Sequence, residues 1–93
     1  MKLEPVKSSN VHAIGWEDTG VLRVVFRSGA IYEYVGVEER VFGELLQAES
    51  VGKTFNKLVR GAYSYRLVKK VNQRVLDRIA YGALARTGTE VAA

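Results

Sequence analysis

The spacing of apolar side chains changes near residue 36, and this change limits the fold to strands followed by helices. Before it, the stretch VLRVVFR over residues 21–27 alternates between two faces, which is the period of a strand. After it, the apolar residues of VEERVFGELLQAE over residues 37–49 recur on one face of a helix. We therefore predict the α+β class, with a small antiparallel sheet and helices packed on one of its faces.

The first third of the chain predicts a meander of about three antiparallel strands. The strand-like stretches are VHAIGW (11–16), VLRVVFR (21–27) and AIYEYV (30–35). The segments between them, EDTG and Ser-Gly, have the composition of tight turns. Two short helices should follow, over 37–49 and 51–60, and Ser50 is well placed to cap the second.

The longest helical pattern covers residues 66–86. One face of it is apolar and consists of Val68, Val71, Val75 and Ile79. Beside this face runs a basic row at i, i+4 spacing, formed by Lys70, Arg74 and Arg78. Gly88 is placed to end this helix, and residues 87–93 are expected to form a loose tail. All 93 residues are expected to form a single domain.

Basic residues gather in the second half of the chain. The net charge is +4, yet residues 53–86 hold nine basic side chains against one acid, Asp77, while residues 1–52 are net acidic. This asymmetry favours an anionic partner for the second half. The alternative is that the basic half packs against the acidic half, within one chain or between subunits.

The chain offers little for catalysis, and we do not expect an enzyme. His12 is the only histidine and cysteine is absent, so neither a histidine relay nor a metal site of histidines or thiolates is expected, and no cofactor is implied. Glu17 and Asp18 are adjacent carboxylates, but turn preference explains them. Because the N-terminus lacks the apolar segment of a signal peptide and the apolar runs are short, we expect a cytoplasmic protein without a membrane partner.

The triplet Gly52-Lys53-Thr54 has the ending of a phosphate-binding P-loop. The full pattern, G-x-x-x-x-G-K-[ST], needs a glycine five residues before Gly52, and Gln47 stands there instead. A chain this short also has little room for a nucleoside triphosphatase core. The triplet therefore does not predict a P-loop.

Two pairs of tyrosines are more suggestive. Tyr32 and Tyr34 are two apart in a predicted strand and so share a face, and Tyr63 and Tyr65 repeat this spacing close to Arg60. Rings on one face can stack nucleobases while nearby cations hold phosphates. The alternative is core packing, with the hydroxyls at the rim.

Several of these residues occur in an order that resembles the KTSC domain family, named for a segment at the C-terminus of some lysyl-tRNA synthetases. The similarity covers residues 6–67 and leaves 68–86 as an added basic helix. Trp16 and Glu38 depart from the family, which commonly has tyrosine and proline at these places. The matching motifs are Ser8-Ser9-Asn10, Gly29 with Tyr32 and Tyr34, Ser50 with Gly52, Phe55 and Asn56, then Arg60, Tyr63 and Tyr65.

The resemblance implies nucleotide chemistry more than a defined activity. The family is described as a candidate RNA binder because of its attachment to a tRNA synthetase, and stand-alone copies occur in bacteria and their phages. Some small phage proteins sequester the cyclic nucleotide signals of host defence. By that analogy we expect a non-catalytic module that sequesters a small phosphate-bearing nucleotide, acting in the host cytoplasm if a phage encodes it.

The candidate ligand residues combine charge, hydrogen bonding and stacking. Arg60 and Lys53 would neutralise phosphate. The full set is Ser8, Ser9, Asn10, Tyr32, Tyr34, Lys53, Asn56, Arg60, Tyr63 and Tyr65. A homo-oligomer with the 66–86 helix at its contact is expected to enclose the ligand.

Two alternatives stay open. An RNA-binding domain would use the same face and add a phosphate track of Lys69, Lys70, Arg74 and Arg78. A protein-interaction module, such as an inhibitor of a host enzyme, would instead dock its 66–86 helix on the partner.

Overall fold

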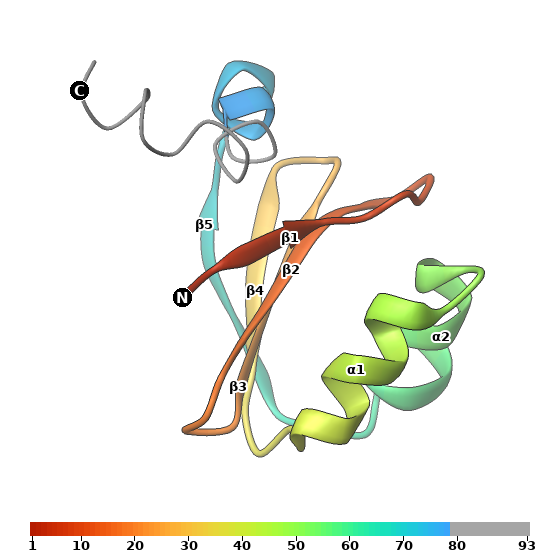
Figure 1. The fold of residues 1–93 in the computed structure, drawn as a ribbon. Helices are drawn as coiled ribbons and strands as arrows, with labels where there is room; N and C mark the ends of the chain where they lie inside the picture. The colour runs from red at the N-terminus through yellow and green to blue at the C-terminus, as the bar shows by residue number, and fades with distance from the viewer. Residues whose placement is uncertain (79–93) are drawn as a thin grey trace.

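The computed structural model of the protein describes residues 1–78, and residues 79–93 lie outside the described part. The chain forms one antiparallel sheet in which the strands lie in sequence order, from β1 to β5, with two helices between the fourth and fifth strands (Figure 1). The elements are β1 (Leu3–Pro5), β2 (Val11–Glu17), β3 (Val21–Phe26), β4 (Ala30–Tyr34), α1 (Glu39–Gln47), α2 (Val51–Leu58) and β5 (Tyr65–Lys70). The predicted α+β class and the antiparallel meander are confirmed, but the sheet has five strands and not three.

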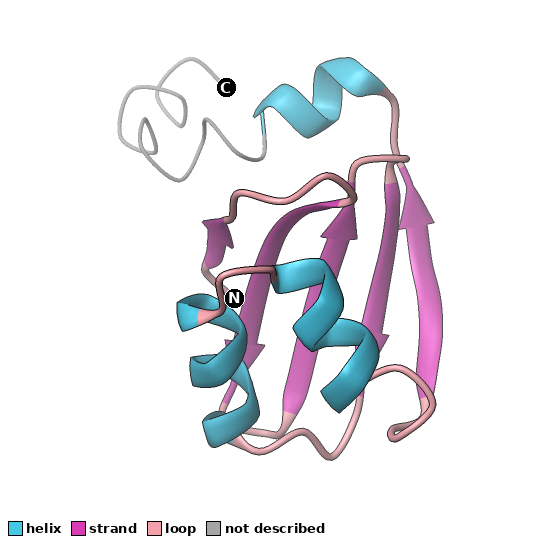
Figure 2. Ribbon diagram, turned by 90° about the vertical axis from the view of Figure 1, so that its right-hand side faces the viewer, coloured by secondary structure: helices cyan, strands magenta, loops and turns pink. Residues whose placement is uncertain are grey.

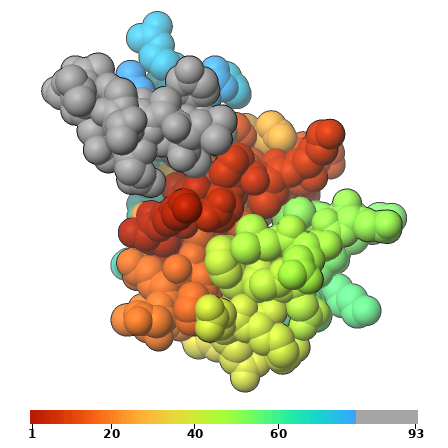
Figure 3. Space-filling view, viewed as in Figure 1, coloured from red at the N-terminus to blue at the C-terminus, as the bar shows by residue number. Residues whose placement is uncertain are grey.

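The first unexpected strand is β1, at the edge of the sheet. It has only three residues, and these pair with β2 so that Leu3 lies opposite Gly15 and Pro5 opposite Ala13. A strand this short shows no alternation in the sequence, and Pro5 is tolerated because an edge strand needs few backbone donors. Figure 3 shows the N-terminal segment, in red, crossing the molecule above the helices in green.

The second unexpected strand is β5, which replaces the start of the predicted long helix. Tyr65 pairs with Tyr34 and Leu67 with Tyr32, so this segment completes the open edge of β4. The sequence YRLVKK also fits a helical pattern, and pairing with the neighbouring strand decides between the two. The prediction of one helix over 66–86 was therefore wrong. Helical turns occur at residues 73–78, whereas the remainder of that helix, Gly88 and the predicted tail lie outside the described residues.

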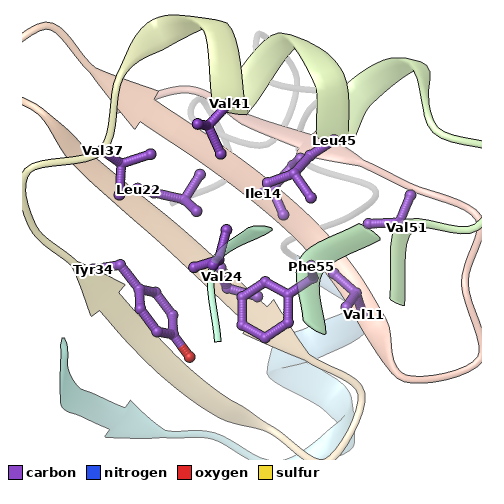
Figure 4. Packing of buried hydrophobic residues seen from close by; sticks show 11 residues of the cluster. Val11, Ile14, Leu22, Val24, Tyr34, Val37, Val41, Leu45, Val51 and Phe55 are labelled. Carbon is purple, nitrogen blue, oxygen red and sulfur yellow. The ribbon is translucent and has the colours of Figure 1, made fainter. Parts of the chain in front are cut away.

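The main core lies between the helices and one face of the sheet. Figure 2 shows α1 and α2 on this face, with β5 beyond the area that they cover. The core side chains come from β2, β3, β4 and both helices, and Figure 4 shows them converging. They are Val11, Ile14, Leu22, Val24, Tyr34, Val37, Val41, Leu45, Val51, Phe55 and Val59. The helices thus cover the middle of the sheet and leave the β4–β5 edge open.

A second, smaller cluster lies on the opposite face of the sheet. Ala13, Val25 and Ile31 pack there against Leu76, which is only 1% exposed and comes from the helical turns after β5. His12 lies at the same place, with its Nε2 2.7 Å from the carbonyl oxygen of Leu76. The segment after β5 therefore folds back onto the sheet, and Leu76 of the predicted contact helix packs within its own chain.

The start of α2 follows the prediction. The Ser50 side chain accepts a hydrogen bond from the backbone N–H of Lys53 at 3.3 Å, which is the expected N-cap contact. This cap fixes where α2 begins, next to the Ser8–Asn10 loop. Neither helix within residues 1–78 has the length and apolar character that crossing a membrane requires.

Candidate functional site

A pocket walled by aromatic rings opens beside α2, at the edge of the sheet that the helices leave uncovered. We call it the aromatic pocket; its volume is about 220 Å³. Phe26, Tyr32 and Tyr34 reach it from β3 and β4, because residues two apart in a strand share a face. Phe55 reaches it from α2 and Tyr65 from β5. Asn10, Asn56, Arg60 and Gly61 complete the lining.

The rings of the aromatic pocket pack closely but leave one of them exposed. Tyr34 and Tyr65 have ring centroids 5.5 Å apart, and Tyr34 meets Phe55 edge-on at 5.4 Å. Tyr34 is 6% exposed and forms part of the core, whereas Tyr65 is 62% exposed. Tyr65 therefore offers a ring on which a planar ligand can stack.

The hydroxyl of Tyr34 stays protonated at neutral pH. Burial raises the pKa of Tyr34 above its usual 10.0, and the neighbouring Tyr32 and Tyr65 raise it further. A neutral hydroxyl can both donate and accept a hydrogen bond but cannot act as a base near pH 7.

A second hollow lies where the segment before β2 meets the start of α2. We call it the polar hollow; its volume is about 290 Å³. Most of its lining is polar or charged: Lys7, Ser8, Ser9, Asn10, Glu49, Ser50, Lys53 and Asn56. The other two lining residues are Val51 and Gly52. Ser8 shapes this wall, since its Oγ donates to Asn10 Oδ1 at 3.0 Å and accepts from the backbone N–H of Val11 at 3.2 Å.

Gly52 explains the Gly-Lys-Thr triplet in structural terms. A Cβ at this position would lie 2.8 Å from Asn10 Oδ1 and 3.6 Å from Ser8 Oγ. The absent side chain lets the loop before β2 approach the first turn of α2. The glycine of the triplet therefore shapes the polar hollow without belonging to a P-loop, and sequence reasoning alone gave no sign of this contact.

A third hollow, which we call the outer hollow, lies beside the β3–β4 turn and has a volume of about 350 Å³. Its lining is Ser9, Asn10, Phe26, Arg27, Ser28, Ala30 and Tyr32. The Arg27 side chain donates from Nε to the carbonyl oxygen of Ser8 at 2.6 Å, which ties the turn to the loop before β2. Asn10 is the residue common to all three hollows.

Nine of the ten predicted ligand residues line these hollows, from segments far apart in the sequence. Asn56 lies in α2 and Arg60 in the turn just after it, and Arg60 Nη1 donates to Asn56 Oδ1 at 3.4 Å. The exception is Tyr63, which lines none of the three and packs half-buried against the main core. That these residues hold a ligand stays a prediction.

Eleven lining residues were not predicted as ligand residues, and Phe26, Phe55 and Arg27 show why. Phe26 and Phe55 have the periodicity of core positions, and their rings indeed pack together at 5.6 Å, so the sequence does not distinguish a pocket wall from a core. Arg27 ends the predicted strand over residues 21–27 and lies one residue beyond the end of β3 at Phe26. Its proximity to Asn10 depends on the β2–β3 pairing, through a backbone hydrogen bond of 2.9 Å.

Arg23 and Arg66, two cations on strands β3 and β5 of the sheet, are paired with the carboxylate of Glu33. Arg66 donates to Glu33 Oε1 at 3.1 Å, and Arg23 donates to Glu33 Oε2. The Arg23 side chain holds the pKa of Glu33 below its usual 4.5, with a further contribution from Arg66, although burial acts in the opposite direction. Within residues 1–78, no three histidine, aspartate or glutamate side chains form a group that could hold a metal ion.

Comparison with known proteins identifies the family. The chain belongs to the KTSC domain family, because the family model, described as the KTSC domain, matches residues 7–63. An uncharacterised protein of Stutzerimonas stutzeri is 36% identical over 61 residues, covering 64% of this chain and 86% of the relative. A protein of Tsukamurella paurometabola is 39% identical over 59 residues, covering 62% of this chain and 88% of the relative.

The fold is also found in a crystal structure of a KTSC domain protein from Yersinia pestis. The two structures share a TM-score of 0.70 at 32% sequence identity, over 72% of this chain and 96% of the other. The family model ends before β5, so Tyr65 and the segment behind the sheet lie outside its match. The aromatic pocket is therefore built by the family region together with the strand that follows it.

Proposed function

We propose that this protein is a non-catalytic module that binds a small phosphate-bearing nucleotide and sequesters it. The observation that carries the proposal is an aromatic pocket that shares Asn10 and Asn56 with a polar hollow containing Lys53. A nucleotide needs these two environments side by side, since its base is apolar and planar while its phosphate is anionic. The shared amide residues lie where the sugar would join the two parts.

The proposed roles follow from the chemistry of each side chain. Tyr65 stacks on the base, and the exposed Asn56 and Asn10 hydrogen-bond the phosphate, sugar or base. Arg60 and Lys53 hold phosphate, Arg60 through its planar fork of donors. Neither cation forms an ion pair with a carboxylate among residues 1–78, so both remain available to an anion in that part of the chain.

Calorimetric titration with a panel of nucleotides, at about physiological ionic strength, tests this proposal. The panel holds adenine and guanine mononucleotides, linear dinucleotides and cyclic dinucleotides. We expect one class of nucleotide to bind saturably. Its affinity should fall at least tenfold in Arg60→Ala, since a charge-assisted hydrogen bond contributes roughly 1.5–3 kcal/mol.

Lys57→Ala is the matched control. Lys57 is a cation on the exposed side of α2 that lines none of the three hollows, so its loss removes the same charge without touching the site. Equal losses in both variants would indicate a general charge effect. Absence of binding by every nucleotide would contradict the proposal.

A second candidate, RNA binding, is favoured by one specific observation. Tyr65 and Leu67 both lie on the pocket face of β5, and Leu67 is 55% exposed. Lys70 pairs with Ala30, a residue of the outer hollow. This strip continues the aromatic pocket along an uncovered strand, as a single-stranded RNA would require. Binding of an RNA oligomer that weakens steeply with salt, while small nucleotides fail to bind, would favour this candidate.

A further inference from the structure

We infer that the site accommodates two linked nucleotide units, with one base in the aromatic pocket, the other in the outer hollow, and the connecting phosphate near Asn10. This inference rests on the proposed function and specifies the ligand of the same site. It follows from how the three hollows divide the available space, and from which side chains lie between them.

The volumes of the three hollows limit what each of them can hold. Pockets that enclose drug-sized ligands span roughly 300–1,000 Å³. The aromatic pocket, at about 220 Å³, is below this range and is suited to a single base. The polar and outer hollows, at about 290 and 350 Å³, also lie at its lower limit. A ligand confined to one hollow would leave the others filled only by water.

Asn10 lines all three hollows. Its Oδ1 accepts a hydrogen bond from Ser8, so its Nδ2 group is the part that can donate to a ligand. A group bound at Asn10 therefore lies at the border of each hollow. A phosphodiester suits this position, because it carries one nucleoside on either side and, between them, two non-bridging oxygens that share one negative charge.

Aromatic rings form the wall between the two base-sized spaces. Phe26 and Tyr32 line both the aromatic pocket and the outer hollow, with ring centroids 5.8 Å apart in an edge-to-face arrangement. The outer hollow therefore also has aromatic lining, beside the exposed Arg27. The polar hollow has no aromatic lining, and its two cations, Lys7 and Lys53, outnumber its one carboxylate, Glu49, so that its net positive charge suits the linking phosphate.

Calorimetric titration with adenosine 5′-monophosphate, pApA and pApApApA, and with their guanine counterparts, tests the inference. We expect a dinucleotide to bind at least about fivefold more tightly than its mononucleotide, because stacking one further base contributes roughly 1–3 kcal/mol. A tetranucleotide should gain no more than about threefold over the dinucleotide, because it offers three registers to a two-unit site.

The variant Ala30→Glu tests where the second base lies, because Ala30 lines the outer hollow and neither of the other two. The added carboxylate fills this hollow and repels phosphate, so dinucleotide affinity should fall to the level of the mononucleotide while mononucleotide affinity stays unchanged. Val35→Glu is the matched control, because it adds the same charge at an exposed position that lines none of the three hollows, and it should bind both ligands like the wild type. Should Ala30→Glu fail to fold by circular dichroism, Ser28→Glu obstructs the same hollow from the exposed turn.

Three outcomes overturn the inference while leaving nucleotide binding intact. The first is equal affinity for mononucleotide and dinucleotide. The second is an equal loss for both ligands in Ala30→Glu. The third is a tetranucleotide that binds tenfold more tightly than the dinucleotide, which identifies a polymer site. Absence of binding by every probe contradicts the proposed function itself and is thus a distinguishable result.

Discussion

Tyr65 of β5 lies directly opposite Tyr34 of β4, and the two rings are 5.5 Å apart. One of them is buried in the core and the other is largely exposed. This cross-strand pair is one of five that join β5 to β4, and it presents a ring at the mouth of the aromatic pocket. The strand that supplies this ring follows the region matched by the KTSC family model.

Removing the exposed ring should weaken ligand binding more than it weakens the fold. Stacking is worth roughly 1–3 kcal/mol per base, so Tyr65→Ala should lower the affinity for the bound nucleotide at least fivefold. Tyr65→Phe keeps the ring and should retain affinity. Calorimetric titration of both variants checks this, with Leu46→Ala on the exposed side of α1 as a control. Equal affinity in Tyr65→Ala and the wild type would show that the ring does not stack on the ligand.

A methyl group at Gly52 should change binding and stability differently. In Gly52→Ala, Asn10 must move, because the new Cβ would lie 2.8 Å from its Oδ1. Alanine favours a helix over glycine by about 1 kcal/mol, which offsets the strain. We therefore expect a change in the free energy of unfolding of under about 1 kcal/mol but a several-fold loss of ligand affinity.

Gly43→Ala is the matched control for that variant. Gly43 lies in α1, where an added Cβ would meet nothing within 4 Å. This variant should gain up to about 1 kcal/mol of stability and keep its affinity. Urea denaturation and titration measure the two quantities. Unchanged ligand affinity in Gly52→Ala would show that the contact between Gly52 and Asn10 does not affect ligand binding.

Acid should destabilise the protein partly through Glu33. Its pKa in the folded state lies below the usual 4.5, chiefly because Arg23 donates to it. The stability that this contact contributes is therefore present above the usual pKa and is lost as pH falls from about 4.5 through the lower folded-state value.

Urea denaturation between pH 7 and pH 3 checks this expectation. In Glu33→Gln the free energy of unfolding should be lower at pH 7 and should depend less on pH than in the wild type. Glu44→Gln breaks an exposed pair with Arg40 and should change stability by at most about 1 kcal/mol. Parallel pH curves for wild type and Glu33→Gln would assign the acid sensitivity to other groups.

The cluster on the back of the sheet should contribute measurably to stability. Leu76 is almost completely buried there, and truncating a buried leucine to alanine costs about 2–5 kcal/mol. Leu76→Ala should therefore lower the free energy of unfolding by this amount in chemical denaturation. Val68→Ala removes an exposed side chain of β5 and should have little effect. Equal stability of Leu76→Ala and the wild type would contradict the packing of this segment on the sheet.

The periodicity of the sequence was sufficient to predict part of this fold. The strands that alternate, such as β3, and the helix capped by Ser50 were predicted within a few residues. β1 was missed because three residues hold too little pattern. β5 was mistaken for a helix because its sequence fits either element, and its partner β4 is distant in the chain. Such pairing depends on tertiary contacts that local propensity does not contain.

The candidate site was predicted to a similar extent. Tyr32 and Tyr34 follow from the two-residue period of a strand, and Asn10, Asn56 and Arg60 follow from the family resemblance. The contact between Gly52 and Asn10 joins segments about forty residues apart and left no local signal. Tyr63 was grouped with Tyr65 by spacing, but the chain reaches β5 only after Tyr63, so the two rings occupy different places.

The most direct test of the account is chemical-shift mapping by NMR. Isotope-labelled protein is titrated with whichever nucleotide of the panel binds most tightly, and backbone amide signals are followed. The account predicts shifts concentrated at Asn10, Gly52, Asn56, Arg60 and Tyr65, with α1 and the back cluster around Leu76 unaffected. Shifts confined to α1 or to the back cluster, or no saturable shifts at all, would contradict it.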